Sequence, residues 1–168
     1  MRFRKVPSRL LRRSSRLPFP RERRRELLCR AALVRAEVDG DGAIELFDAL
    51  FDEDASDDIA TRSMARFAEL LDAAGAHAKL AARWEQVARG RARAGDAGAA
   101  CNGWCSAGSI WEAHGDLACA IAAFRQGAAL SSETSFEALA RIHEGRQEWK
   151  DAANALEWLK SHAYRLDF

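Results

Sequence analysis

A short acidic segment near the start of the chain has residue types and spacing that could hold a metal ion. Glu37, Asp39 and Asp41 alternate along the sequence, Gly42 follows them, and Asp48 ends the segment. Hard cations such as Ca²⁺ take about six to eight oxygen ligands, and carboxylates at alternate positions can supply part of such a set. The segment is therefore a candidate calcium site.

Residues 37–48 resemble the calcium loop of the EF-hand family, in which alternating carboxylates surround a turn glycine. The loop departs from that family at its first ligand, which is Glu37 instead of Asp, and at its last, which is Asp48 instead of a bidentate Glu. EF-hands also normally pair, and no second loop follows at a suitable distance. A turn between two helices would use the same residues, because Asp and Gly favour turns and N-caps. An EF-hand-like calcium-binding helical protein is therefore an alternative function.

The cysteines and histidines offer weaker chemistry. Cys101 and Cys105 lie four residues apart, which on a helix makes half of a zinc site, but no matching pair follows. We expect the four cysteines to be reduced, and these two to replace Ala in tight packing. The sequence contains no glycine-rich phosphate loop and no nucleophile elbow, and no histidine is combined with a cysteine or serine in a recognisable catalytic motif. We therefore predict no enzyme, no catalytic residue, no resident metal and no cofactor.

The net charge of +1 hides an asymmetry between the two ends of the chain. Residues 1–30 hold 12 Lys and Arg against Glu22 and Glu26, whereas the remainder is acidic. All three prolines also fall in the first 20 residues, which disfavours a helix there. We predict that residues 1–21 form a basic, unstructured arm, as a solvated tail, a start-site extension or a transit peptide. An anionic partner of the arm, such as RNA, DNA or acidic lipid, is another interpretation of its charge. The second alternative function is a nucleic-acid-associated protein that acts through residues 1–30.

The body of the chain, residues 22–168, has the pattern of amphipathic helices. It is rich in Ala, contains no Pro and has few β-branched residues, which disfavours a sheet core. No apolar run reaches the roughly 20 residues that a membrane span needs, and we expect a cytoplasmic location. Short polar breaks predict eight helices in an all-α domain, with sequential helices as antiparallel neighbours. The breaks are Asp39–Gly42, Asp52–Asp58, Gly75, Gly95–Asp96, Gly115–Asp116, Ser131–Ser132 and Gly145.

Every second helix carries a small or aliphatic residue followed four positions later by a larger one. This spacing lets two helices approach closely while the large side chain fills the gap beside them. The pairs are Ala43/Phe47, Leu80/Trp84, Ala120/Phe124 and Ala152/Leu156.

Residues 101–134 resemble the tetratricopeptide repeat (TPR) family. Trp104, Gly108 and Trp111 match the family's aromatic, glycine and tyrosine positions in the first helix. The small, aliphatic and aromatic positions of the second helix are Ala120, Ile121 and Phe124, whereas the terminal proline is replaced by Ser132. Residues 24–56, 61–96 and 133–166 match the pattern in part. The resemblance implies an α-solenoid of about four antiparallel helix pairs wound as a right-handed superhelix.

The same resemblance implies a non-enzymatic module that binds a peptide or protein on the concave face, which the first helix of each pair lines. A solvated face of mixed charge is the other interpretation of the residues there. Of the Asn and Lys that clamp a peptide carboxylate in some relatives, only Asn102 is present, so we predict no clamp. The residues placed on the face are Arg62, Arg66, Glu69, Asn102, Ser106, Ser109, Glu112, Thr134, Glu137 and Arg141.

The last stretch, residues 163–168, contains apolar side chains and no polar capping helix of the kind that isolated repeat arrays need. Two expectations follow: a homo-oligomer formed through the uncapped last helix, or a piece of a longer array.

Overall fold

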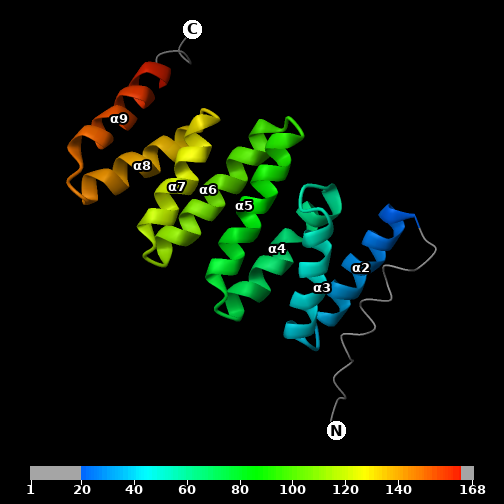
Figure 1. The fold of residues 1–168 in the computed structure, drawn as a ribbon. Coiled ribbons are helices and arrows are strands. Elements are labelled where there is room, and N and C mark those ends of the chain that lie inside the picture. The colour runs from blue at the N-terminus through cyan, green and yellow to red at the C-terminus, as the bar shows by residue number, and fades with distance from the viewer. Residues whose placement is uncertain (1–19, 164–168) are drawn as a thin grey trace. The chain divides into compact units, whose positions relative to one another are not determined.

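The computed structural model describes residues 20–163, so that the predicted arm 1–21 lies outside it except for its last two residues. Within residues 20–163 the chain forms eight helices and no strand, which confirms the predicted all-α class (Figure 1). The right-handed winding stays a prediction. The helices are α2 (Arg21–Arg35), α3 (Gly40–Glu53), α4 (Asp58–Ala73), α5 (His77–Arg93), α6 (Ala97–Ala113), α7 (Leu117–Ala129), α8 (Glu133–Gly145) and α9 (Trp149–Ala163).

The chain divides into two compact units, residues 1–70 and residues 71–168. In the first unit, α2 packs on α3. Three phenylalanine rings form the centre of its core: the Phe67 ring lies 5.2 Å from that of Phe47 and 5.1 Å from that of Phe51. All three side chains are fully buried, as is Ala43, which precedes Phe47 by one helical turn.

A buried arginine joins α2 to the turn between α3 and α4 in this unit. Arg25 is only 2% exposed. Its guanidinium donates to the backbone oxygens of Leu50 at 3.0 Å and Asp54 at 2.7 Å, and its Nε donates to the carboxylate of Asp57. A buried charge is stable only when it is paired and hydrogen-bonded, and these contacts meet both conditions.

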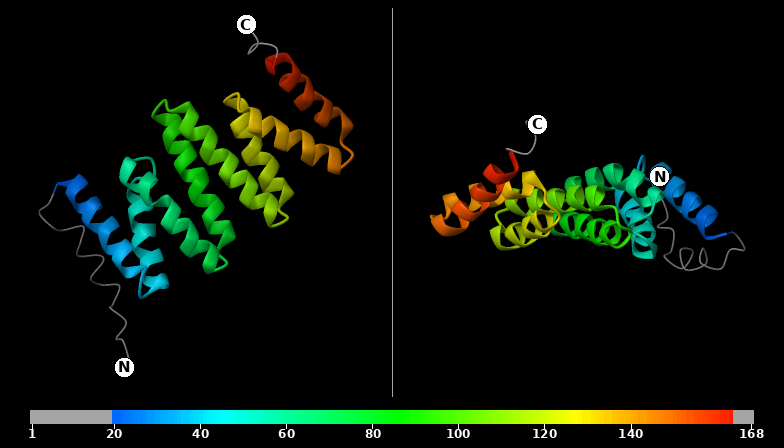
Figure 2. Two further views of the ribbon diagram at one scale, coloured as in Figure 1. Left: turned by 180° about the vertical axis from the view of Figure 1, so that it is seen from behind. Right: turned by 90° about the horizontal axis from the view of Figure 1, so that it is seen from above.

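In the second unit each helix from α5 to α9 packs on the next one along the chain (Figures 1 and 2). Two clusters of buried side chains fill the interfaces. Apolar residues of α7 and α8 and Ala155 of α9 form the larger cluster, and residues of α5, α6 and α7 around Trp104 form the smaller one.

Glycines allow two close approaches of α6 to its neighbours. A β-carbon at Gly108 would lie 2.7 Å from the ring of Phe124 in α7, and one at Gly103 would lie 2.9 Å from the β-carbon of Ala88 in α5. The pairing of a glycine in the first helix with an aromatic in the second therefore sets how closely α6 and α7 pack.

Each turn between the helices of the second unit contains one residue with a left-handed backbone conformation. In the first three turns this residue is a glycine: φ is 67° at Gly75, 81° at Gly95 and 81° at Gly115. In the next two turns the same role falls to non-glycine residues, Ser131 with a φ of 63° and Gln147 with a φ of 60°. The break predicted at Gly145 therefore lies two residues later, and Gly145 belongs to α8.

Two further predictions about the elements need correction. The break predicted at Asp39–Gly42 ends at Asp39, because the Asp39 side chain caps α3 by accepting a hydrogen bond from the Gly42 amide. Gly40 and Gly42 therefore belong to the helix. Leu156, predicted to pack between helices, is 46% exposed. Trp149 on the same helix is 65% exposed.

Candidate functional site

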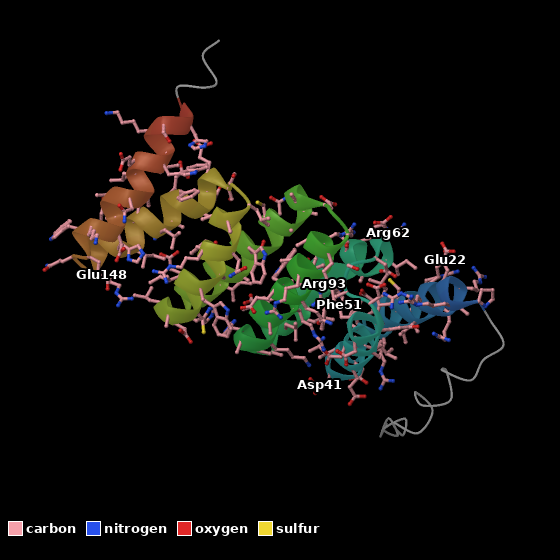
Figure 3. The ribbon with its side chains drawn as sticks, turned by 45° about the horizontal axis from the view of Figure 1, so that its top comes forward. Glu22, Asp41, Phe51, Arg62, Arg93 and Glu148 are labelled. Carbon is pink, nitrogen blue, oxygen red and sulfur yellow. The ribbon has the colours of Figure 1, made fainter. Side chains whose placement is uncertain are left out.

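The predicted partner-binding residues of α4 are engaged within the first unit. Arg66 contacts Glu69 at 2.7 Å and Glu37 at 3.3 Å, and the hydrogen bond with Glu69 is the main cause of its raised pKa. The Nε of Arg62 donates to the backbone oxygen of Asp58 at 3.1 Å. Arg62 is exposed (Figure 3). Glu69 is also exposed and Arg66 is half-buried, and the polar groups of all three residues already have partners.

In the second unit, two predicted site residues contact each other. Arg141 of α8 forms a two-pronged ion pair with Glu112 of α6, with its second nitrogen 2.9 Å from Oε2. The pKa of Arg141 is raised because Glu112 accepts its hydrogen bonds. The pair therefore joins two helices that are not consecutive in the chain.

Thiols and hydroxyls add contacts from α6 to α7, to α8 and to the turn between them. Cys101 Sγ donates to the backbone oxygens of Gly127 at 3.8 Å and Leu130 at 3.7 Å, and Cys105 Sγ lies 3.2 Å from the hydroxyl of Ser135. None of the four cysteines forms a disulfide within residues 20–163. Burial is the main cause of the raised pKa of Cys101, so this thiol is not activated as a nucleophile.

A second group of polar side chains on α6 takes no part in these contacts. Asn102 and Ser109 are exposed and Ser106 is half-buried. In the part of the chain that the structure describes, none of the three side chains forms a hydrogen bond. On α8, Thr134 and Glu137 are likewise exposed and have no partner within residues 20–163. We call these five residues the polar strip; they are the predicted site residues of this unit that remain available to a ligand.

The candidate calcium loop does not gather its carboxylates. Asp39 caps α3 and also contacts Arg35 at 2.5 Å, and its pKa is lowered first by the Gly42 amide and then by Arg35. Gly42, expected at the turn of a loop, lies in the first turn of α3. Within the described residues, the segment 37–48 provides no group of three ligand atoms close enough to share a cation.

Several arginines in the described part of the basic segment 1–30 pair with acidic residues of the first unit. Arg21 contacts Asp54 at 3.1 Å, Arg24 pairs with Glu53, and Arg25 is buried. The arginine run and the acidic turn that follows α3 are thus complementary. Their opposite charges are visible in the sequence and could have indicated the pairing.

Two features of the second unit were not foreseen. The first is an open pocket of about 210 Å³ between α5, α6 and α7. The second is a group of possible metal ligands at the turn between α8 and α9, where atoms of His143, Glu148 and Asp151 lie within 4.8 Å of one another.

The second feature does not fit a metal ion. Nδ1 of buried His143 donates to Oε2 of Glu148 at 2.6 Å, and the other oxygen of Glu148 contacts Arg146 at 2.8 Å. The hydrogen bond from His143 is the largest cause of the lowered pKa of Glu148. Because a neighbouring guanidinium already balances this carboxylate, the contacts fix the turn between the two helices instead of leaving free ligands.

None of the helices within residues 20–163 has the length and apolar character needed to cross a membrane.

No protein-family model matches the chain, and no curated protein matches it. Among solved structures, it is similar to the crystal structure of BtubC (BKLC) from P. vanneervenii. The TM-score is 0.57 at 12% sequence identity, over 95% of this chain and 72% of that chain. At this identity the similarity shows the fold alone.

Proposed function

We propose that this chain is a non-enzymatic protein-interaction module of the TPR type, which holds a peptide or protein against the polar strip of α6 and α8. The observation that carries the proposal is the contrast along α6. Cys101, Cys105 and Glu112 are hydrogen-bonded to neighbouring elements, whereas Asn102, Ser106 and Ser109 have no partner within the described residues. Amide and hydroxyl groups at helical spacing can bond the backbone of an extended peptide.

The packing beneath the strip supports the TPR-type geometry. The close approach of Gly108 to Phe124 lies in the segment that resembles the family most clearly. The ion pair between Glu112 and Arg141 holds α6 and α8 together. A strip carried by two joined helices is pre-organised, which reduces the entropy cost of binding.

We further propose a reducing location such as the cytoplasm, because the four cysteines are free.

Panning a phage-displayed library of random peptides on the whole chain tests the proposed function. Each enriched peptide is then measured by anisotropy against the variant Asn102→Ala/Ser106→Ala/Ser109→Ala. Alanine keeps the helix, so the variant removes polar groups without removing the fold. We expect its affinity to fall tenfold or more.

The matched control changes Lys150, Asn154 and Glu157 of α9 to Ala. These exposed residues have the same spacing as the strip residues of α6. Peptide binding should be unchanged in the control. Enrichment of no peptide, or equal loss of affinity in both variants, contradicts the proposal.

A further inference from the structure

The open pocket between α5, α6 and α7 is lined by two arginines, one glutamine and four apolar residues. Its volume is about 210 Å³, which suits a side chain or a short segment instead of a folded surface. The residues that line it are Arg89, Ala92, Arg93, Trp104, Gln126, Ala129 and Leu130. No carboxylate is among them, and none of them belongs to the polar strip.

The two arginines differ in what they already contact. Arg89 pairs with Glu85 on the same helix, and its guanidinium lies 5.5 Å from the centre of the Trp104 ring. Arg93, the last residue of α5, is exposed and forms no ion pair or hydrogen bond within the described part of the chain (Figure 3). The nearby Asp96 is 3.9 Å from Arg91. The pocket therefore carries one positive charge that no group within residues 71–163 pairs with.

The apolar lining residues of the pocket suit an apolar group of a ligand. Trp104 and Leu130 belong to the smaller core cluster, and both line the pocket. Gln126, which also lines the pocket, is exposed and has no partner among the described residues, so its amide can donate a hydrogen bond.

We infer that this pocket binds an acidic peptide: Arg93 and Gln126 hold a carboxylate side chain, and an adjoining apolar side chain rests on Trp104 and Leu130. A guanidinium and an amide are both donors to a carboxylate, and the charge-assisted bond is the stronger one. Nucleic acid fits less well, because its affinity comes from several phosphate contacts and only Arg93 is uncommitted here. This site is separate from the proposed function, since the two share no residue.

Fluorescence anisotropy on the whole chain tests the inference. The probe is a labelled pentapeptide that alternates leucine with glutamate, and its partner replaces each glutamate with glutamine. We expect the acidic probe to bind at least tenfold more tightly than the glutamine probe, and its affinity to fall as salt rises. Equal affinity of the two probes overturns the inference.

Two variants locate the contact. Arg93→Gln should weaken the acidic probe at least tenfold, whereas Arg125→Gln, which removes the same charge beside the pocket-lining Gln126, should leave it unchanged. Gln126→Glu places a carboxylate in the pocket and should also abolish binding. Equal weakening by the two arginine variants, or stronger Arg93-dependent binding of a single-stranded RNA decamer, overturns the inference. The triple α6 variant described above should bind the acidic probe normally, which separates failure of this site from failure of the polar strip.

Discussion

The backbone of Gly108 in α6 faces the ring of Phe124 in α7 so closely that a β-carbon at position 108 would lie 2.7 Å from the ring. Phe124 is almost fully buried, with core neighbours on other sides. Its ring cannot move away without disturbing the cluster that joins α7 to α8. The glycine is therefore required for close approach and not for backbone freedom.

Gly108→Ala should destabilise the chain by about 1–3 kcal/mol, because the added methyl group overpacks the interface with Phe124. Chemical denaturation followed by circular dichroism measures the change. Gly98→Ala in the same helix is the matched control: a β-carbon there meets only Asp96 Oδ1 at 3.9 Å, so alanine should stabilise by about 0.5–1 kcal/mol. Stabilisation by both substitutions would refute the steric argument.

Arg25→Ala should lower the unfolding free energy of the first unit by about 3 kcal/mol. The substitution removes the guanidinium from which the backbone oxygens of Leu50 and Asp54 and the carboxylate of Asp57 accept hydrogen bonds. Urea unfolding of the whole chain gives the measurement. Arg23→Ala removes an exposed arginine that pairs with Glu26 at 3.1 Å, and should cost less than about 1 kcal/mol. Similar losses in the two variants would show that Arg25 acts only through its charge.

Gln147→Gly should stabilise the second unit by about 1 kcal/mol. Gln147 has a φ of 60°, a conformation that costs a side-chain-bearing residue about 1–2 kcal/mol and that glycine adopts freely. Thermal unfolding should show a melting temperature about 2–4 °C higher. Gly115→Gln makes the reverse change at a turn with a φ of 81° and should lower the melting temperature. A lower melting temperature for Gln147→Gly would mean that the glutamine side chain stabilises this turn.

The contact between His143 and Glu148 should make stability depend on pH. The hydrogen bond from His143 lowers the pKa of Glu148 below its ordinary value of 4.5. A carboxyl with a lowered pKa in the folded state contributes stability above its unfolded pKa and loses it as the pH falls through the folded pKa. Glu148→Gln should therefore be less stable than the wild type at pH 6. The two should converge as the pH falls through the lowered pKa of Glu148, as denaturation at a series of pH values would show. A difference that stays constant from pH 6 to pH 3 would exclude this origin.

Much of the fold follows from local patterns. The all-α class follows from the Ala-rich, Pro-free composition of the body, and Asp116, in one of the predicted breaks, caps α7 by accepting from the Cys119 amide at 3.0 Å. The small-then-large pairs Ala43/Phe47 and Ala120/Phe124 are buried. Such features depend on neighbours within one or two turns, which sequence spacing describes directly.

The candidate site was harder to predict, because its geometry depends on contacts between helices. The TPR resemblance predicts that Glu112 and Arg141 lie on the concave face but does not reveal that they contact each other across 29 residues. The pocket beside Arg93 likewise combines residues of three helices. Periodicity determines which face of a helix is polar; it does not determine how far one helix is offset along the next.

The contacts that join α6 to α8 and the turn before it bridge 26 to 30 residues of sequence. During synthesis on a ribosome, Cys101 and Glu112 therefore meet their partners once a few dozen further residues have emerged. Such short-range closure loses little chain entropy and favours rapid folding. Each added hairpin can thus be buried as it is made, without waiting for a distant segment of the polypeptide.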